Sequence, residues 1–101
     1  MAVKILMSWD VAPGREQEEY FEFVVRELLP GMQGLGLELN DAWVTIYGDH
    51  PQILMSVMLP TANKAQQVML SNEWKSLFNK LQDFVTNYSY KIVPASGGFQ
   101  F

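Results

Sequence analysis

Cysteine is absent from the 101 residues of this chain, and histidine occurs once, as His50. The lack of cysteine excludes disulfides, thiolate catalysis and zinc or iron–sulfur sites built on cysteine. Charged residues are also scarce, at 18% of the sequence, and seven basic residues against eleven acidic ones give a net charge of −4. Because phosphate contacts need a basic face, this balance argues against nucleic acid as a partner.

Long apolar runs are missing as well. None of them approaches the roughly 20 residues that a helix needs to span a bilayer. The segment Met1–Leu6 has the pattern of a strand and lacks the charged and apolar regions of a signal peptide. We therefore expect a cytoplasmic protein with no membrane partner.

Apolar side chains, in contrast, are abundant. They make up 49% of the chain, including 3 Trp, 4 Tyr, 6 Phe and 6 Met. A domain of this length buries only roughly two-thirds of the surface of its unfolded chain. So many large apolar side chains exceed the needs of one small core, which suggests that a second chain covers some of them.

Alternation of side-chain type predicts four strands. The first covers residues 3–11, the second lies within 37–48, the third covers 52–59 and the last covers 88–93. The segment Asp49-His50-Pro51 predicts a compact turn, so the second and third strands should form a hairpin.

Apolar residues at three- and four-residue spacing predict the helices. The first begins at Arg15, and Pro30 should kink or end it because proline has no amide hydrogen. Gly31, Gly34 and Gly36 loosen the segment that follows, and the chain should leave the helix near Leu35-Gly36. Thr61 is a candidate N-cap for a second helix. Ser71 can cap a further helical segment, whose apolar stripe continues as far as Val85.

The resulting order, β-α-β-β-α-β, predicts an α+β fold of the ferredoxin-like kind. In this arrangement an antiparallel four-stranded sheet carries both helices on one face. We expect residues 1–94 to form a single domain and residues 95–101 to be a C-terminal tail.

The sheet face without helices is the informative one. For the second strand, the set Trp43, Thr45 and Tyr47 is favoured there over Ala42, Val44 and Ile46, because aliphatic side chains pack more simply under helices. A face with Leu, Met, Trp and Tyr side by side is a large apolar patch, which a second copy would cover in a symmetric dimer. The residues expected at this interface are Leu6, Trp43, Thr45, Leu54, Met58, Phe99 and Phe101.

Two local segments and the order of elements resemble the dimeric α/β-barrel superfamily. One segment is Asp10–Arg15 (DVAPGR), at the joint between the first strand and the first helix. The other is Ser71–Lys75 (SNEWK), followed by Leu77, Leu81 and Val85, which resembles the start of the last helix in NIPSNAP-like proteins. The superfamily also includes antibiotic-biosynthesis monooxygenases and stress-responsive barrel proteins.

The resemblance covers nearly the whole chain. It implies a homodimer of ferredoxin-like subunits, with a cavity either between each sheet and its helices or between the two sheets. It does not imply one chemistry, because members include cofactor-free oxygenases, haem-degrading enzymes, isomerases and proteins without known activity. The haem-degrading members of the superfamily rely on a buried Asn, a His and a Trp around the cofactor. In this chain the first strand holds Lys4, Ser8 and Asp10 but no Asn, and the last helix holds no His. This departure from their pattern argues against haem binding, and we expect no cofactor.

The candidate site residues each have a structural alternative. Ser8 and Ser56 are either pocket hydroxyls or small residues that relieve crowding at an interface. Trp74 begins a helical stripe and is more often a core residue than part of a pocket. Trp43 faces either a cavity or a dimer partner. The candidate ligand-binding residues are Ser8, Asp10, Trp43, Tyr47, Ser56 and Trp74.

The remaining polar candidates are less well supported. Asp10, Arg26 and Tyr47 would make a polar set at one cavity mouth if the fold brought them together, but Arg26 can equally pair with Glu22, four residues before it. His50 is either an acid–base group or an exposed turn residue, and without a second ligand nearby it predicts no metal site.

Two function hypotheses follow. The first is a homodimer whose cavity binds a small apolar or aromatic molecule, with activity of a cofactor-independent monooxygenase or isomerase kind. The second is a non-catalytic module that only dimerises. The tail bears on both, because Gly97-Gly98 before Phe99 and Phe101 suggests an arm that docks on the partner, the alternative being a frayed end.

Overall fold

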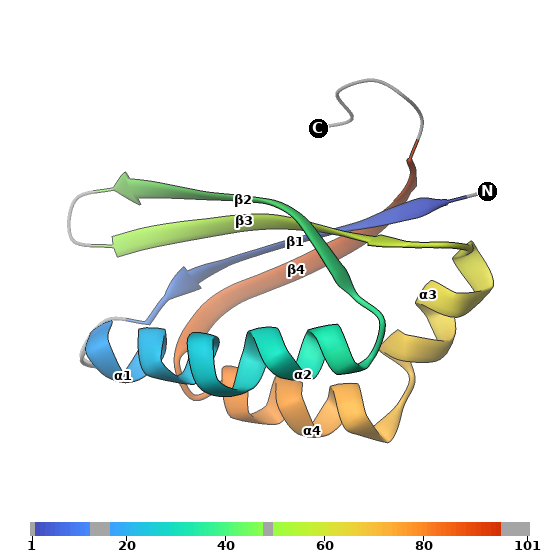
Figure 1. Ribbon diagram of the computed structural model, residues 1–101. Coiled ribbons are helices and arrows are strands. Elements are labelled where there is room, and N and C mark those ends of the chain that lie inside the picture. The colour runs from blue at the N-terminus through green and yellow to red at the C-terminus, as the bar shows by residue number, and fades with distance from the viewer. Residues whose placement is uncertain (1, 13–16, 48–49, 96–101) are drawn as a thin grey trace.

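A computed structural model describes residues 2–12, 17–47 and 50–95, apart from the side chains of residues 17, 46, 47, 50 and 51. Its elements follow one another in the predicted order (Figure 1). The helical region after the first strand consists of three consecutive segments, and the one after the third strand consists of two helices. They are β1 (Val3–Val11), α1 (Gln17–Phe23), the π-helical segment η1 (Val24–Leu28), α2 (Leu29–Gly34), β2 (Glu38–Tyr47), β3 (His50–Leu59), α3 (Ala62–Met69), α4 (Asn72–Leu81) and β4 (Val85–Pro94).

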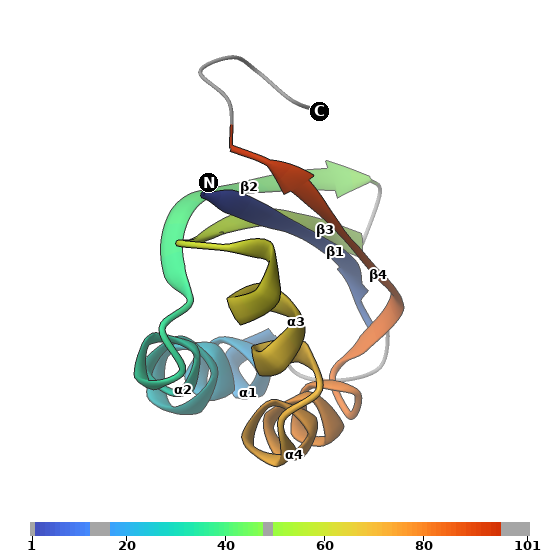
Figure 2. The same cartoon turned by 90° about the vertical axis from the view of Figure 1, so that its right-hand side faces the viewer.

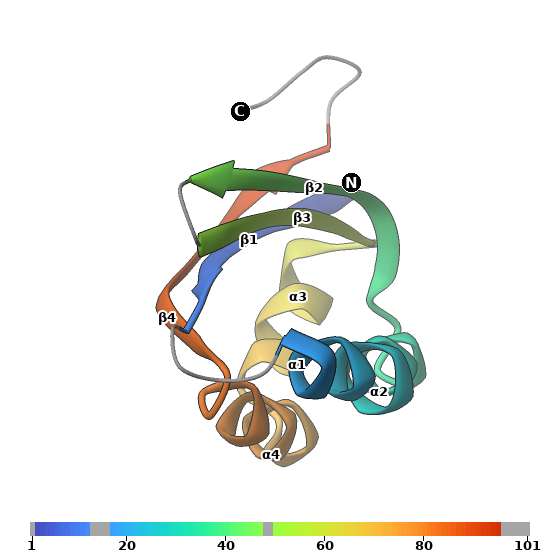
Figure 3. The same cartoon turned by 90° about the vertical axis from the view of Figure 1, so that its left-hand side faces the viewer.

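The four strands form one antiparallel sheet in the order β2-β3-β1-β4. All helices lie on one side of this sheet, as Figure 2 and Figure 3 show from opposite directions. The predicted ferredoxin-like α+β fold is therefore confirmed.

The core lies between the sheet and the helices. In β1, alternate side chains from Val3 to Val11 are buried on the helix side, as the predicted period of two requires. Trp9 and Met7 are almost completely buried there. They meet buried side chains from β3, such as Val57, and from α4, such as Leu81.

The first helix continues past Pro30, where the sequence predicted a kink or an end. The helix widens into the π-helical segment η1 just before the proline, and the amide of Leu29 donates to the carbonyl of Val24, five residues earlier. Pro30 then lies in the first turn of α2, where a missing amide hydrogen costs least. The π turn therefore accommodates the proline, and the helix ends at Gly34, with Gly36 at φ +84°.

The last helix is shorter than its apolar stripe predicted. It ends at Leu81, and the amide of Phe84 turns back to the carbonyl of Leu81. The amide of Ala12 then donates to the carbonyl of Phe84, which draws the chain into the sheet. Val85 belongs to β4, where it pairs with Val11 of β1, so the prediction that it continues the helix was wrong. An apolar run alone does not distinguish a buried helix from a buried strand.

The hairpin between β2 and β3 is tighter than predicted. His50 and Pro51 were expected in the turn, but both belong to β3, where they pair with Tyr47 and Ile46. The strand thus begins at His50 and not at Gln52. Proline is tolerated there because it lies at the start of the strand.

Candidate functional site

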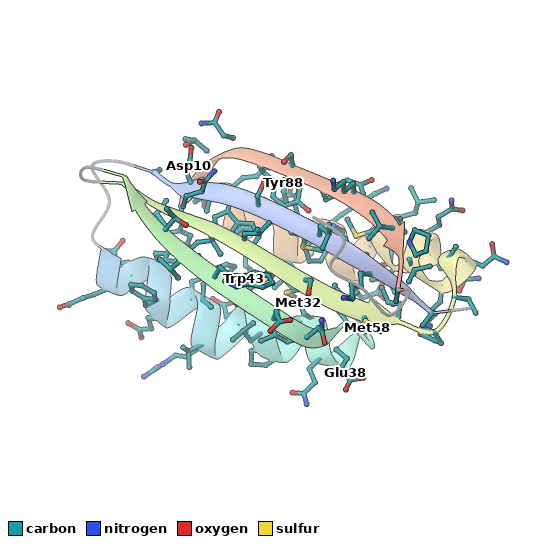
Figure 4. All side chains as sticks on the ribbon, turned by 90° about the horizontal axis from the view of Figure 1, so that it is seen from above. Asp10, Met32, Glu38, Trp43, Met58 and Tyr88 are labelled. Carbon is teal, nitrogen blue, oxygen red and sulfur yellow. The ribbon has the colours of Figure 1, made fainter. Side chains whose placement is uncertain are left out.

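The sheet face that carries no helices, called the open face from here on, is seen directly in Figure 4. The strand register pairs Trp43 with Leu54 and Leu54 with Ser8, which places these side chains together on one face. Trp9, the next residue after Ser8, is buried on the helix side. The aromatic set of the second strand is therefore on the open face at Trp43, as expected.

The two candidate serines lie on neighbouring central strands of the open face. The Ser8 hydroxyl lies 3.0 Å from the Ser89 hydroxyl on β4. Ser56 is buried and accepts a hydrogen bond from the Asn40 side-chain amide at 3.3 Å. Both hydroxyls thus bond to neighbouring strands, and Ser56 has little room to contact a ligand.

Asp10 lies at the far end of the open face, beside an irregular stretch of β4. Two residues of β4, Asn87 and Tyr88, stand opposite the single residue Trp9, which makes a β-bulge. Asn87 adopts the left-handed φ of 56°, a conformation that asparagine tolerates better than most residues. Its side-chain amide donates to the Asp10 carboxylate at 2.8 Å.

The residues predicted for the dimer interface differ in exposure. Leu6 is 4% exposed even in the single chain, because its neighbours on adjacent strands already cover it. Leu54 and Met58 are half-buried on the open face, and Thr45 is exposed there. These four residues and Trp43 form an apolar band with polar edges.

A shallow hollow of about 340 Å³ lies within this band. It brings together three of the predicted residues, Leu6, Ser8 and Leu54, with residues of β4 that were not predicted. The added residues are Ser89, Tyr90 and Lys91.

Trp74 lies on the other side of the sheet from these residues. It is buried in the core, and its ring stacks on Phe78 of the same helix with centroids 6.2 Å apart. Phe78 in turn contacts Tyr88, whose ring lies 6.1 Å from that of Trp9. The structure therefore does not bring Trp74 together with Ser8 or Trp43.

Two tyrosines of this aromatic region have notable hydroxyls: Tyr20 is buried, and Tyr88 is partly buried. The Trp9 indole nitrogen donates to the Tyr20 hydroxyl at 2.9 Å. The Tyr88 hydroxyl is buried and has no hydrogen-bond partner among the described residues. Burial raises the pKa of Tyr20, and burial together with the nearby Tyr90 raises the pKa of Tyr88.

The polar set of Asp10, Arg26 and Tyr47 is not assembled. Arg26 is exposed on η1 and pairs with Glu22 at 3.4 Å, the alternative that the sequence left open. The side chains of Tyr47 and His50 lie outside the described residues.

The C-terminal arm, with Phe99 and Phe101, also lies outside the described residues.

The sequence did not predict a cleft between α2 and β2. It has a volume of about 470 Å³, and the buried side chains of Met32, Leu37 and Val57 form its inner part. Met32 and Glu38 mark its position beside β2 in Figure 4. The lining residues are Leu29, Met32, Gln33, Gly36, Leu37, Glu38, Leu39 and Val57. We call this space the α2–β2 cleft.

Large apolar side chains remain exposed on the first helix and on β2. Phe21 on α1 and Val25 on η1 are 49% and 65% exposed. On β2, Leu39 and Val44 are 47% and 58% exposed, although the register turns both toward the helix layer. The helices therefore leave the edge strand β2 incompletely covered. Only the three-dimensional packing shows this gap.

Within the described residues, no three His, Asp or Glu side chains gather where they could hold a metal ion. Among the helices of that part of the chain, none is both long and apolar enough to cross a membrane.

A comparison with protein-family models finds none that matches the chain, and a comparison with curated proteins finds no match either. Solved structures do match over almost the full length. A NIPSNAP family protein from Agrobacterium tumefaciens superimposes with a TM-score of 0.69 at 14% identity, covering 96% of this chain and 95% of that one.

Two further neighbours are named as oxygenases. SnoaB, a cofactor-independent oxygenase from Streptomyces nogalater, has a TM-score of 0.68 at 7% identity, with 96% of this chain and 95% of that chain covered. A putative antibiotic biosynthesis monooxygenase from Chloroflexus aurantiacus has a TM-score of 0.64 at 9% identity, with 99% and 98% covered. At these identities the likeness shows a shared fold.

Proposed function

We propose that this chain, which has the fold of NIPSNAP family and antibiotic-biosynthesis-monooxygenase proteins, binds a small apolar or aromatic molecule in the α2–β2 cleft and works as a homodimer. The observation that carries the first part is the cleft itself. Its volume of about 470 Å³ lies within the range of roughly 300–1,000 Å³ that is common for small-molecule sites.

The lining of the cleft favours an apolar occupant. Five of its side chains are aliphatic or thioether groups, and Gln33 and Glu38 supply the polar ones. The exposed wall formed by Leu39 gains free energy when a ligand covers it, at about 25 cal/mol per Å² of apolar surface. Binding would therefore be driven by apolar contact and oriented by the two polar side chains.

The likeness to a cofactor-independent oxygenase supports oxygenation of an aromatic ligand as the chemistry. Among the lining side chains, the Glu38 carboxylate is the group that can accept a proton. A ligand identified by binding is to be tested for oxygen uptake in wild type and in Glu38→Gln.

Titration with 1-naphthalenemethanol tests the binding proposal. We expect methyl NMR signals of Met32, Leu39 and Val57 to shift on saturation. Leu39→Glu should weaken binding about ten-fold by placing a charge on the apolar wall. Leu70→Glu, an equal change at the exposed C-cap of α3, is the matched control and should bind like wild type. Unchanged signals at saturating probe would overturn the proposal.

The homodimer proposal rests on the apolar band of the open face. Trp43 and Leu54 lie opposite each other there, and Met58 lies four residues farther along β3 on the same face; a second copy of this face is the simplest cover for them. Trp43→Asp should shift the sedimentation coefficient from dimer to monomer at micromolar concentration. A variant that still sediments as a dimer would show that Trp43 does not face the partner.

The same apolar band also supports the alternative of a non-catalytic dimerisation module. This alternative predicts that the wild-type chain dimerises and that no small molecule perturbs the α2–β2 cleft. The titration above therefore separates the two functions.

A further inference from the structure

The electrostatics of the α2–β2 cleft point to the chemical class of its ligand. The segments α1, η1 and α2 follow one another without a break from Gln17 to Gly34 and form one continuous helix. Aligned peptide dipoles place a partial negative charge at the C-terminal end of such a helix. This end lies at the cleft, because Gln33 and Gly36 are among the lining residues.

The negative end of this helix is not compensated by a basic side chain. The last turn of α2 contains no Lys or Arg. Backbone amides of Leu35, Gly36 and Leu37 bond to carbonyls of the last turn, so the chain closes the helix without bringing a cation to it. The local potential at this end of the cleft is therefore negative.

Glu38 adds a full negative charge at the mouth of the cleft: it is the first residue of the edge strand β2, and the register turns its side chain toward the open-face side of that edge. It is exposed, lines the cleft and is the charged member of the lining set. The cation nearest to it in the strand register is Lys4, which is separated from it by Met58 in a cross-strand row on the open face. A ligand carboxylate at this mouth would meet negative charge without a lining cation to pair with it.

We propose that the ligand of this cleft is an apolar amine, whose ammonium group lies at the mouth beside Glu38 and the helix C-terminus. The apolar body would contact Leu29, Met32 and Val57 inside. This inference rests on the proposed binding function and narrows it, because it separates amines from fatty acids and aromatic acids of the same size.

Three probes with one ring system test the assignment: 1-naphthylmethylamine, 1-naphthalenemethanol and 1-naphthoate. Their dissociation constants are measured at pH 7 by methyl NMR titration of the wild-type chain, at low salt and in 0.5 M salt. At low salt the amine should bind roughly ten-fold more tightly than the carboxylate, with the alcohol between them, because a helix dipole and a partly exposed charge each contribute modestly. In 0.5 M salt the difference in affinity between the amine and the carboxylate should be smaller, because salt screens the charges.

Two variants locate the source of the preference. Glu38→Gln should reduce the ratio of amine to carboxylate affinity about three-fold. Glu73→Gln removes the same charge at an exposed position on α4 and should leave the ratio unchanged. Leu39→Lys places a cation on the cleft wall and should reverse the order of the two charged probes.

The outcomes distinguish this inference from the function on which it rests. If no probe shifts the cleft methyl groups, the binding function itself fails. If the alcohol binds and the two charged probes bind equally, or if the carboxylate binds best, the binding function stands and the amine assignment is wrong. The expected order, altered by Glu38→Gln but not by Glu73→Gln, supports both.

Discussion

At the scale of single residues, the hydroxyls of Tyr20 and Tyr88 differ in what they contact. Tyr20 accepts the hydrogen bond of the Trp9 indole, whereas the Tyr88 hydroxyl is buried without a partner in the described part of the chain. A buried donor that loses its partner costs about 1–3 kcal/mol, while a hydroxyl that makes no bond contributes nothing to repay its desolvation. The two positions therefore offer matched substitutions.

We expect Tyr20→Phe to lower the free energy of unfolding by about 1–3 kcal/mol, because it leaves the Trp9 indole N–H unpaired. Tyr88→Phe removes an equal atom and should leave stability unchanged or increase it. Urea denaturation followed by tryptophan fluorescence measures both. A Tyr88→Phe variant as destabilised as Tyr20→Phe would show that the Tyr88 hydroxyl has a partner after all.

The raised pKa of Tyr88 also predicts a loss of stability in alkali. An unfolded chain releases this proton near the ordinary value of 10.0, whereas the folded chain holds it because burial disfavours the phenolate. Above pH 10 the unfolded state therefore binds fewer protons, and the free energy of unfolding falls as the pH rises. In urea titrations between pH 9 and 11.5, Tyr88→Phe should fall less steeply than wild type. Parallel pH profiles would contradict this.

At the scale of elements, local capping residues determine where helices begin, whereas tertiary packing determines where the last helix ends. Ser71 and Thr61 were recognised as N-caps, and both do accept hydrogen bonds from amides three residues later, those of Trp74 and Lys64. The end of the last helix, which depends on tertiary pairing, was missed. The amide of Ala12, just after the first strand, donates to the carbonyl of Phe84 beyond the end of α4.

The cap at Ser71 should matter more than the cap at Thr61. The Ser71 hydroxyl accepts from the Trp74 amide at 3.2 Å and donates to the Val68 carbonyl at 2.6 Å, so it joins the end of α3 to the start of α4. We expect Ser71→Ala to cost about 1–2 kcal/mol and Thr61→Ala about half as much, since Thr61 is exposed. Thermal and urea unfolding measure both, and equal losses would argue against the joining role.

At the scale of the whole molecule, the open face is divided by charge. Glu38 and Asp41 lie along the edge strand β2, whereas Lys4 and Lys91 lie on β1 and β4 across the sheet. In a face-to-face dimer, a two-fold axis parallel to the strands would place β2 of one subunit over β4 of the other. This orientation brings opposite charges together and is the one we expect.

A charge exchange tests this orientation. Asp41→Lys and Lys91→Asp should each weaken dimerisation about five-fold to ten-fold, because each places like charges across the interface. The double variant should recover most of the wild-type affinity. Sedimentation equilibrium at low salt measures the dissociation constants. If the double variant shows the product of the two single losses in dimer affinity, a two-fold axis parallel to the strands is excluded.

Much of the fold could be predicted because alternation and helical spacing are local properties of the sequence. The alternation in β1 correctly separated the buried side of Trp9 from the open side of Ser8. The candidate site was less predictable. Ser8, Asp10 and Trp43 were expected to share a face and do so, but their contacts with Ser89 and Asn87 depend on strand register and on a bulge that no local pattern revealed.

The sequence by itself determined the order of the elements, the helix caps and the apolar faces, because each follows from side-chain type at a fixed local spacing. Only the tertiary structure decided where helices and sheet fail to meet. The α2–β2 cleft exists because a continuous helix ends beside an edge strand that it does not fully cover, with Leu39 left half-exposed. That separation depends on how whole elements pack against one another, which no segment of the chain encodes alone.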